Sequence, residues 1–291
     1  MSTYALILVL GAALLHASWN FLLKRAGGGG SFVWLCSCIT TLIYAPLAIG
    51  IIWYQHIAIN ALQLAFMAGT ATLHTIYFLL LARGYRYGDL SLVYPLARGS
   101  GPLLTILVAV LLLHERPSFM ALIGAALLAL GVLLLTFDPR KKIDFAAIGS
   151  RNGLAVAYAL LTGATIASYT VWDKYAVATL LIPPLVLDWA SNLGRTVMLA
   201  PFILRDASGL KSVWRNYRRE AIAVAVFGPL SYILALTAMV FTPVSYVAPA
   251  REISILFAAL MGTQLLNEKQ GKRRLIAAAI MVGGLIMLAT N

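Results

Sequence analysis

The chain has 291 residues, of which 61% are hydrophobic and only 11% are charged. Soluble domains carry about 25% charged residues and fewer than half apolar ones, so the composition excludes a soluble protein and indicates an integral membrane protein. The formal net charge of +12 lies in short clusters between apolar runs, a distribution typical of membrane topology and not of a nucleic-acid-binding surface. Cys36 and Cys38 share one apolar stretch, so no disulfide framework is expected.

Ten apolar runs are long enough to cross a bilayer, which takes about 20 residues. Because an open sheet cannot satisfy its backbone polar groups in lipid, each run is predicted to be a helix. No connection between the runs is long enough to form a further domain. The predicted spans are 4–23, 32–54, 61–82, 90–113, 118–137, 152–173, 183–204, 220–240, 244–266 and 273–290.

Lys and Arg residues predict the orientation of these spans, because they remain on the cytoplasmic side. Of the 22 such residues, seventeen follow the first, third, fifth, seventh or ninth span, and only Arg116 and Lys174 lie in the opposite set of connections. Both termini are therefore expected outside the cytoplasm. Arg98, Arg195 and Arg251 lie inside spans, where a charge costs at least about 2.5 kcal/mol and needs a partner.

The second half of the chain repeats the first. Residues 17–26 align with 167–176 at an offset of 150, and a later set aligns at 153 or 154. Chance similarity between apolar helices is the alternative, but it would rarely match Pro, Arg and Glu together. The later set pairs Ser91, Pro95, Arg98, Glu115 and Gly131 with Ser245, Pro249, Arg251, Glu268 and Gly284.

A duplicated unit of five helices enters the membrane in opposite orientations, which predicts an inverted repeat. We therefore expect an all-α integral membrane protein with ten transmembrane helices arranged as two inverted five-helix repeats. The first repeat is predicted at 1–137, a cytoplasmic connector at 138–151 and the second repeat at 152–291.

The chain resembles the drug/metabolite transporter superfamily, and within it the ten-helix EamA-type exporters. The resemblance covers nearly the whole chain and depends on the duplicated unit and on residues near the first and fourth spans. These are Trp19, Asn20 and Phe21 with Lys24 just after the first span, and the run from Ser91 to Arg98 followed by Pro102 and Glu115. Within that family the chain is most like the YddG-type amino-acid exporters of bacterial inner membranes. Small multidrug pumps of the superfamily exchange protons at a glutamate in their first helix, but this first span has no acidic residue.

Polar and aromatic side chains recur three, four or seven residues apart in several spans and so share one helix face. Such faces point to other helices or to a water-filled cavity, and packing is the alternative for hydroxyl groups. The cavity is favoured for aromatic and imidazole side chains from the first, third, fourth and sixth spans. The candidate substrate-binding residues are His16, Trp19, Asn20, His74, Tyr77, Tyr94, Arg98, Tyr158, Tyr169 and Trp172.

Proline placement suggests two gates. Pro95 and Pro249 each remove a backbone donor and bend the start of their helix. Because the fourth and ninth spans begin on opposite sides, the two Pro/Arg elements are expected at opposite ends of the pathway, although kinks needed only for packing are the alternative. The candidate gating or coupling residues are Pro95, Asp188, Arg195, Pro249, Arg251 and Glu252.

The charged residues inside the spans have different predicted partners. Asp188 and Arg195 share a face of the seventh span, about 10.5 Å apart along the axis, and form either a structural polar network or part of the substrate path. Arg98 has no acidic neighbour on its own helix. Its expected partner is therefore a substrate carboxylate or a residue such as Glu252 or Asp188.

The favoured function is a secondary transporter that exports small metabolites, preferably amino acids, by alternating access. The alternatives are a flippase for a lipid-linked headgroup, or an intramembrane enzyme or scaffold. Phosphate-loop, zinc-protease and hydrolase motifs are absent from the sequence, so no enzyme activity, cofactor or metal is expected. The expected partners are a small-molecule substrate and the lipid bilayer, without nucleic acid, for a monomer or loose homodimer in the bacterial inner membrane with periplasmic termini.

Overall fold

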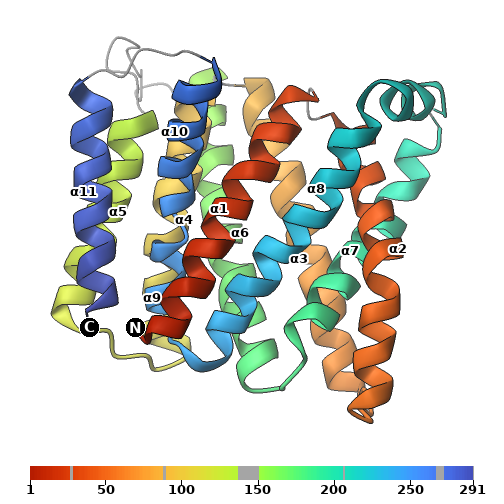
Figure 1. The fold of residues 1–291 in the computed structure, drawn as a ribbon, viewed down its shortest axis with the longest axis horizontal. Helices are drawn as coiled ribbons and strands as arrows, with labels where there is room; N and C mark the ends of the chain where they lie inside the picture. The colour runs from red at the N-terminus through yellow and green to blue at the C-terminus, as the bar shows by residue number, and fades with distance from the viewer. Residues whose placement is uncertain (27–28, 88–89, 137–150, 206, 267–271, 291) are drawn as a thin grey trace.

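A computed structural model describes residues 1–26, 29–87, 90–136, 151–205, 207–266 and 272–290 (Figure 1). These residues form helices and short connections, with no strand among them. Each of the ten predicted spans is helical, and the ninth is divided in two. The helices are α1 (Thr3–Arg25), α2 (Gly30–Tyr54), α3 (Ala61–Tyr87), α4 (Leu90–Leu112), α5 (Phe119–Thr136), α6 (Arg151–Ala178), α7 (Pro184–Ile203), α8 (Ala207–Phe241), α9 (Val244–Ala250), α10 (Ile253–Leu266) and α11 (Lys272–Ala289).

Several helix ends differ from the predicted spans. Both α3 and α6 continue about a turn beyond them, to Tyr87 and Ala178. α8 begins at Ala207 instead of residue 220 and is kinked at Tyr217, whose φ of −133° and ψ of 24° are not helical. The basic segment before the eighth span is therefore helical itself. Of the expected connector, residues 138–150 lie outside the described residues, and Arg151 begins α6.

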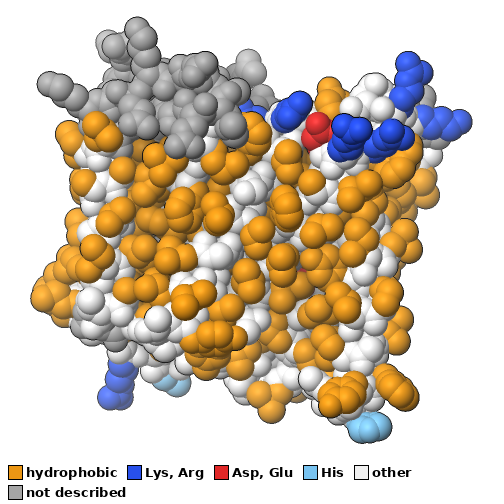
Figure 2. Space-filling view, viewed as in Figure 1, with side chains coloured by type: hydrophobic (Ala, Val, Ile, Leu, Met, Phe, Trp, Pro, Cys, Tyr) orange, Lys and Arg blue, Asp and Glu red, His pale blue; other side chains and the backbone are white. Residues whose placement is uncertain are grey.

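The apolar helices leave a largely apolar outer surface. Six helical segments of the described residues are long and apolar enough to cross a membrane, and three shorter apolar helical segments accompany them. On the face shown in Figure 2, apolar side chains cover the middle of the molecule, and most visible Lys and Arg side chains gather at the end opposite the two termini (Figures 1 and 2). This distribution matches a protein surrounded by lipid.

The helices pack in pairs that relate the two halves of the chain. α1 packs on α8, and its counterpart α6 packs on α3. α2 packs on its counterpart α7, and α5 on its counterpart α11. The first helix of each repeat thus packs on the third helix of the other repeat, and the second and fifth helices each pack on their own counterpart. This is the pattern expected of two units related by a two-fold axis. The packing thus agrees with two inverted five-helix repeats.

The α5·α11 pair shows this symmetry at close range. A Cβ atom added to Gly124 would lie 2.7 Å from the Gly284 carbonyl oxygen, and one added to Gly284 would lie 2.6 Å from the Gly124 carbonyl oxygen. Because neither residue has a side chain, the two backbones can approach closely, as small residues allow in membrane helices.

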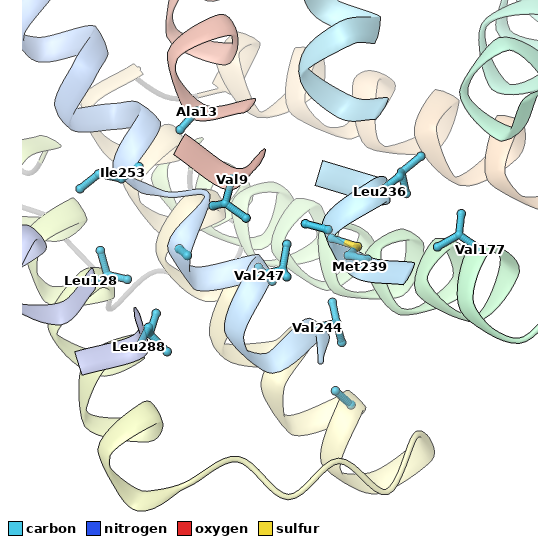
Figure 3. Close-up of a cluster of buried hydrophobic side chains, with 14 of the residues drawn as sticks. Val9, Ala13, Leu128, Val177, Leu236, Met239, Val244, Val247, Ile253 and Leu288 are labelled. Atoms are coloured by element: carbon cyan, nitrogen blue, oxygen red, sulfur yellow. The ribbon is translucent and has the colours of Figure 1, made fainter. Parts of the chain in front are cut away.

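Apolar side chains from both halves meet in one buried cluster (Figure 3). Val9 of α1 and Leu128 of α5 belong to it, together with Leu236 of α8, Val247 of α9 and Leu288 of α11. All five side chains are fully buried. The cluster therefore joins the two halves rather than filling each half separately.

The ninth span is interrupted between α9 and α10, where the sequence predicted one continuous helix. Pro249 has no N–H group and cannot donate to the carbonyl one turn earlier. Beyond it the Glu252 N–H donates to the Pro249 carbonyl at 3.0 Å, and the Ser254 N–H donates to the Arg251 carbonyl at 3.1 Å. These bonds span three residues and tighten the turn, so Arg251 and Glu252 lie at a break inside the span.

Two charged side chains hold helix ends beside this core. The Glu115 carboxylate, between α4 and α5, accepts the N–H groups of Val244 at 2.8 Å and Ser245 at 2.9 Å, at the start of α9. The Lys174 ammonium donates to the Met239 carbonyl at 2.6 Å, in the last turn of α8. An anion at a helix N-terminus and a cation at a C-terminus both complement the helix dipole. Glu115 and Lys174 therefore have structural roles.

Candidate functional site

An ion pair joins the two repeats at the break in the ninth span. The Arg98 Nε atom of α4 lies 3.2 Å from the Glu252 Oε2 atom, and the two side chains are only 10% and 6% exposed. The expectation that Arg98 pairs with a carboxylate from another helix, with Glu252 as one candidate, is confirmed. The pair connects α4 of the first repeat to the α9–α10 break of the second.

The position of this pair corrects the expected placement of the two Pro/Arg elements. Arg98 lies eight residues after the start of α4, and Glu252 lies eight residues after the start of α9. Each is thus about 12 Å from its own end of the bundle, within an apolar layer of about 30 Å. The elements enter from opposite ends, but Arg98 and the Arg251–Glu252 break meet near the middle. The expectation that the arginines mark opposite ends is wrong.

The ion pair is incompletely satisfied. Arg98 Nε and Glu252 Oε2 are both buried and, among the described residues, neither has a hydrogen-bond partner. The two atoms are close enough to attract each other, but their angle does not make a hydrogen bond. Tyr94, one turn earlier on α4, interacts with the Arg98 guanidinium. Both charged groups therefore retain hydrogen-bonding capacity.

Arg251, beside this pair, has an aromatic partner. Its guanidinium carbon lies 5.1 Å from the centre of the Tyr232 ring of α8, within the range of a cation–π interaction. In the part of the chain that the structure describes, Arg251 forms no ion pair with a carboxylate. Its charge also lies within electrostatic reach of Glu252.

A second polar centre surrounds Asp173 on α6, which is fully buried. Three side chains from two other helices contact its carboxylate. The Thr70 hydroxyl donates to Oδ1 at 2.6 Å, the Tyr232 hydroxyl donates to Oδ2 at 2.5 Å, and the His74 Nε2 atom lies 3.0 Å from Oδ2. This centre thus joins α3 of the first repeat to α6 and α8 of the second.

Sequence reasoning missed Asp173 and Tyr232. Asp173 lies four residues after Tyr169, so it continues the predicted polar face of the sixth span by one turn. Its position at the end of the predicted span, next to Lys174, hid this relation. Tyr232 carries no comparable signal, because no polar side chain lies three or four residues away from it on the same helix face.

Aromatic rings connect the two centres. The His74 ring centre lies 4.2 Å from that of Tyr169 and 5.2 Å from that of Tyr232. The Tyr77 ring lies 5.7 Å from Tyr169 in an edge-to-face arrangement. His16 of α1 lies within the electrostatic reach of Arg98 and Arg251. The structure therefore brings together His74, Tyr77 and Tyr169, with His16 nearby.

The polar residues of α7 form a third centre. The Asn192 amide donates to Asp188 Oδ2 at 3.1 Å, and the Arg195 Nη1 atom donates to Asn192 Oδ1 at 3.5 Å. Asn192 thus bridges Asp188 and Arg195, as the shared face of this helix predicted. The Arg195 Nε atom is buried and has no hydrogen-bond partner among the described residues.

Other predicted residues lie elsewhere. Trp172 stacks on Phe66 at 4.1 Å and donates its indole N–H to the Phe66 carbonyl at 3.0 Å, so it packs α6 against α3. The Tyr158 ring stacks on Tyr87 at 5.4 Å. Both contacts are explained by helix packing.

Trp19 and Asn20 contact His16 differently. The Trp19 ring stands edge-on to the His16 ring at 5.0 Å and also packs against the buried cluster around Phe32. The Asn20 amide donates to the His16 carbonyl at 2.8 Å, so Asn20 is engaged with its own helix. Pro95 lies within α4, and its side chain is outside the described part of the structure.

Among the described residues, no group of three or more His, Cys, Asp or Glu side chains could hold a metal ion. The site is instead a set of paired charges, imidazole and phenol groups.

The fold and the site together define the class of the protein. Inverted repeats with charged groups buried between them are the architecture of secondary membrane transporters. The model of the EamA-like transporter family matches residues 3–137 and again residues 153–290. The chain therefore belongs to the EamA-like transporter family, within the drug/metabolite transporter superfamily.

Comparison with solved structures agrees on the fold. One structure, described only as "Crystal structure of protein", is 16% identical to the chain and has a TM-score of 0.73. The match covers 99% of this chain and 96% of that chain. At this identity the likeness concerns the fold alone. No curated protein is similar enough to match the chain.

Proposed function

We propose that this transporter exports small metabolites, and specifically amino acids, from the cytoplasm across the bacterial inner membrane by alternating access, as the YddG-type exporters do. The observation that carries the proposal is the buried Arg98–Glu252 ion pair between the repeats. Its two charges have opposite sign and lie beside a further arginine, Arg251.

Alternating access requires one repeat to move against the other, and the ion pair opposes this movement. Separating a buried pair leaves two uncompensated charges, at about 3–5 kcal/mol when one partner is removed. An amino acid carries both a carboxylate and an ammonium group. Its carboxylate can replace Glu252 on Arg98 and its ammonium can pair with the released Glu252, so that no charge remains unpaired. A metabolite without charged groups cannot replace both partners of the ion pair in this way.

The remaining charged residues of the interior fit the same role. Arg251 supplies a second cation for the substrate carboxylate, and its cation–π contact with Tyr232 is weaker than an ion pair would be. Asp188 and Arg195, at α7, are proposed to gate the pathway, and Pro95 and Pro249 to provide its two flexible elements.

The orientation follows from the distribution of Lys and Arg. We propose that the basic end of the molecule faces the cytoplasm and that both termini lie in the periplasm. The repeats are proposed to span 1–137 and 152–291, with a cytoplasmic connector at 138–151, in a monomer or loose homodimer.

Counterflow in proteoliposomes tests the proposal. The purified protein, loaded with one unlabelled amino acid at a time from a panel, should take up the same labelled amino acid without any ion gradient. Arg98→Lys keeps the charge but loses the planar fork of the guanidinium, so it should lower the exchange rate at least about tenfold, the equivalent of 1.4 kcal/mol. Arg25→Lys is the matched control, because the Arg25 side chain is 68% exposed, and it should exchange at the parent rate.

Two results would contradict the proposal. Absence of exchange for every amino acid, with transfer of a labelled lipid-linked sugar between leaflets, would favour the flippase. Exchange by Arg98→Lys at the rate of Arg25→Lys would remove Arg98 from the substrate path.

A further inference from the structure

We infer that His74 and Asp173 form a proton-binding pair that couples export to the entry of a proton. The inference rests on the proposed function and deepens it, because it names the ion that drives transport. It depends on how the side chains around Asp173 are arranged.

The contacts of Asp173 surround its carboxylate with hydrogen-bond donors. Thr70 and Tyr232 each direct a hydroxyl at one of the two carboxylate oxygens, at 2.6 Å and 2.5 Å. An ionised carboxylate can accept all of these bonds together with one from His74, whereas a protonated carboxyl would have to donate one. In the inferred pair the carboxylate accepts all three hydrogen bonds, and the His74 Nε2 atom, 3.0 Å from Oδ2, is the third donor.

The second ring nitrogen of His74 is the site at which a proton binds. With Nε2–H donated to Asp173, Nδ1 is the basic atom, and a proton there makes an imidazolium paired with the carboxylate. In the described residues no Lys or Arg forms an ion pair with Asp173. The pair is thus anionic when His74 is neutral and balanced when His74 is protonated. Only 12% of the His74 side chain is exposed, so this difference is not cancelled by water.

The surrounding groups keep the proton exchangeable. The cations Arg195 and Arg251 and the Asp173 carboxylate all lie within electrostatic reach of His74. Asp188 lies within electrostatic reach of Asp173. Further charged and titratable groups lie within electrostatic reach of the pair or of the tyrosines beside it. They come from α3, α4, α6, α7, α8 and the α9–α10 break, and they are Tyr77, Tyr94, Arg98, Tyr169, Asp188, Arg195, Tyr232, Arg251 and Glu252.

The same groups connect the proton to the substrate. Tyr169 lies against His74 at 4.2 Å and is within electrostatic reach of Glu252. A substrate ammonium held by Glu252 and an imidazolium at His74 would be two like charges around one ring, in surroundings that screen them poorly. Binding of one therefore weakens binding of the other. In the export step the substrate is carried outward while His74 is neutral. In the return step His74 Nδ1 carries a proton from the periplasm and releases it to the cytoplasm.

The experiment uses the parent protein in proteoliposomes, with the amino acid that gives counterflow. Counterflow without a gradient tests the proposed function alone. An imposed pH gradient then tests the coupling, because exchange of one proton per substrate supports about a tenfold substrate gradient per pH unit. Accumulation should follow the gradient, and a pH dye inside the vesicles should report proton movement on addition of the amino acid.

Variants assign the proton to the pair. His74→Gln keeps an N–H donor for Asp173 but cannot titrate, so the ratio of accumulation with and without the gradient should fall to about one, whatever the remaining rate. Asp173→Asn should have the same effect. His56→Gln is the matched control, because His56 is exposed at the end of α2, and its ratio should equal that of the parent.

Direct proton release covers the case in which a variant no longer transports. Addition of the amino acid to the parent protein in weakly buffered detergent should release up to one proton per protein, and His74→Gln should release none. Counterflow by the parent without any response to the pH gradient would overturn the coupling and leave the carrier intact. A parental accumulation ratio or proton release in His74→Gln would overturn the assignment to this pair.

Discussion

At the scale of single residues, the charges inside the spans balance. Three arginines, at 98, 195 and 251, accompany three acids, at 173, 188 and 252. Each has a polar or aromatic partner, and the Arg98 and Asp173 contacts cross between the repeats. Because burying an unpaired charge in an apolar layer is costly, this balance is expected to control stability as well as transport.

The Arg98–Glu252 pair gives the first prediction. Arg98→Ala leaves Glu252 buried without its cation and should destabilise the protein by about 3–5 kcal/mol. The double variant Arg98→Met with Glu252→Gln removes both charges and should recover most of this loss, but not counterflow. Unfolding in detergent measures the stability of both. A double variant less stable than Arg98→Ala would show that the pair is not the main partner of either group.

Trp172 gives the second prediction, because its indole packs against α3. Its ring occupies space beside Gly69, where an added Cβ would lie 2.5 Å from the ring. Trp172→Ala should lower stability by about 2–3 kcal/mol, below the usual range for a buried Trp because its side chain is only partly buried. Counterflow per folded molecule should not change. A specific loss of substrate affinity with normal unfolding would return Trp172 to the substrate site.

At the scale of helices, the break between α9 and α10 places Arg251 and Glu252 at the centre. The N-terminal end of α9 is held by Glu115 from the connection between α4 and α5, in the other repeat. α9 has only seven residues, too few to be stable alone. Its position therefore depends on this cap and on its neighbours.

The cap leads to the third prediction. Glu115→Ala leaves two N–H groups of α9 without their acceptor and should cost about 1–2 kcal/mol, in the range of a lost helix cap. Glu115→Gln keeps an acceptor oxygen and should lose less. Hydrogen exchange of the α9 amide groups should rise more in Glu115→Ala than in Glu115→Gln. Equal exchange in both variants and the parent would exclude the capping role.

The glycines of the last helix give the fourth prediction, with a control in the adjacent position. Gly284→Ala places a Cβ against the Gly124 carbonyl oxygen and should separate α5 from α11, with a clear fall in the unfolding temperature. At Gly283 an added Cβ meets nothing within 4 Å. Gly283→Ala should therefore be neutral or stabilise by up to about 1 kcal/mol through helix propensity. An unfolding temperature of Gly284→Ala equal to or above that of Gly283→Ala would contradict the prediction.

The sequence predicted helices better than it predicted their interruptions. Run length and hydropathy found all ten spans, because the bilayer fixes the length of a helix. The break at Arg251 was missed, although Pro249 marked its place, because a proline permits a kink without determining how far the helix unwinds. Helix faces predicted Arg98, His74, Tyr77 and Tyr169, but partners from distant segments, such as Asp173 with Thr70, require the packing of α3 on α6.

At the scale of the whole molecule, the repeats interlock rather than stand side by side. α1 packs on α8 and α3 on α6, so the first helix of each repeat lies against the third helix of the other. Two of the three contacts of Asp173, those with Thr70 and His74, also cross between repeats. A movement that separates the repeats must therefore change the contacts of both the Arg98–Glu252 pair and the His74–Asp173 pair. The proposed substrate and the proposed proton would then act on the same movement.

The orientation of the molecule gives the last prediction. Both termini lie at one end (Figure 1), and the Met1 amine donates to the Ala289 carbonyl at 3.2 Å. Seventeen of the 22 Lys and Arg residues are in connections assigned to the opposite end, and they are expected to remain in the cytoplasm. In a background with Cys36→Ala and Cys38→Ser, single cysteines at Lys141 and Arg215 should react with an impermeant maleimide only after the cells are permeabilised. A cysteine at Asn291 should react in intact cells. The reverse pattern would show that the protein has the opposite orientation in the membrane. The substrate would then have to enter from the end that carries the termini.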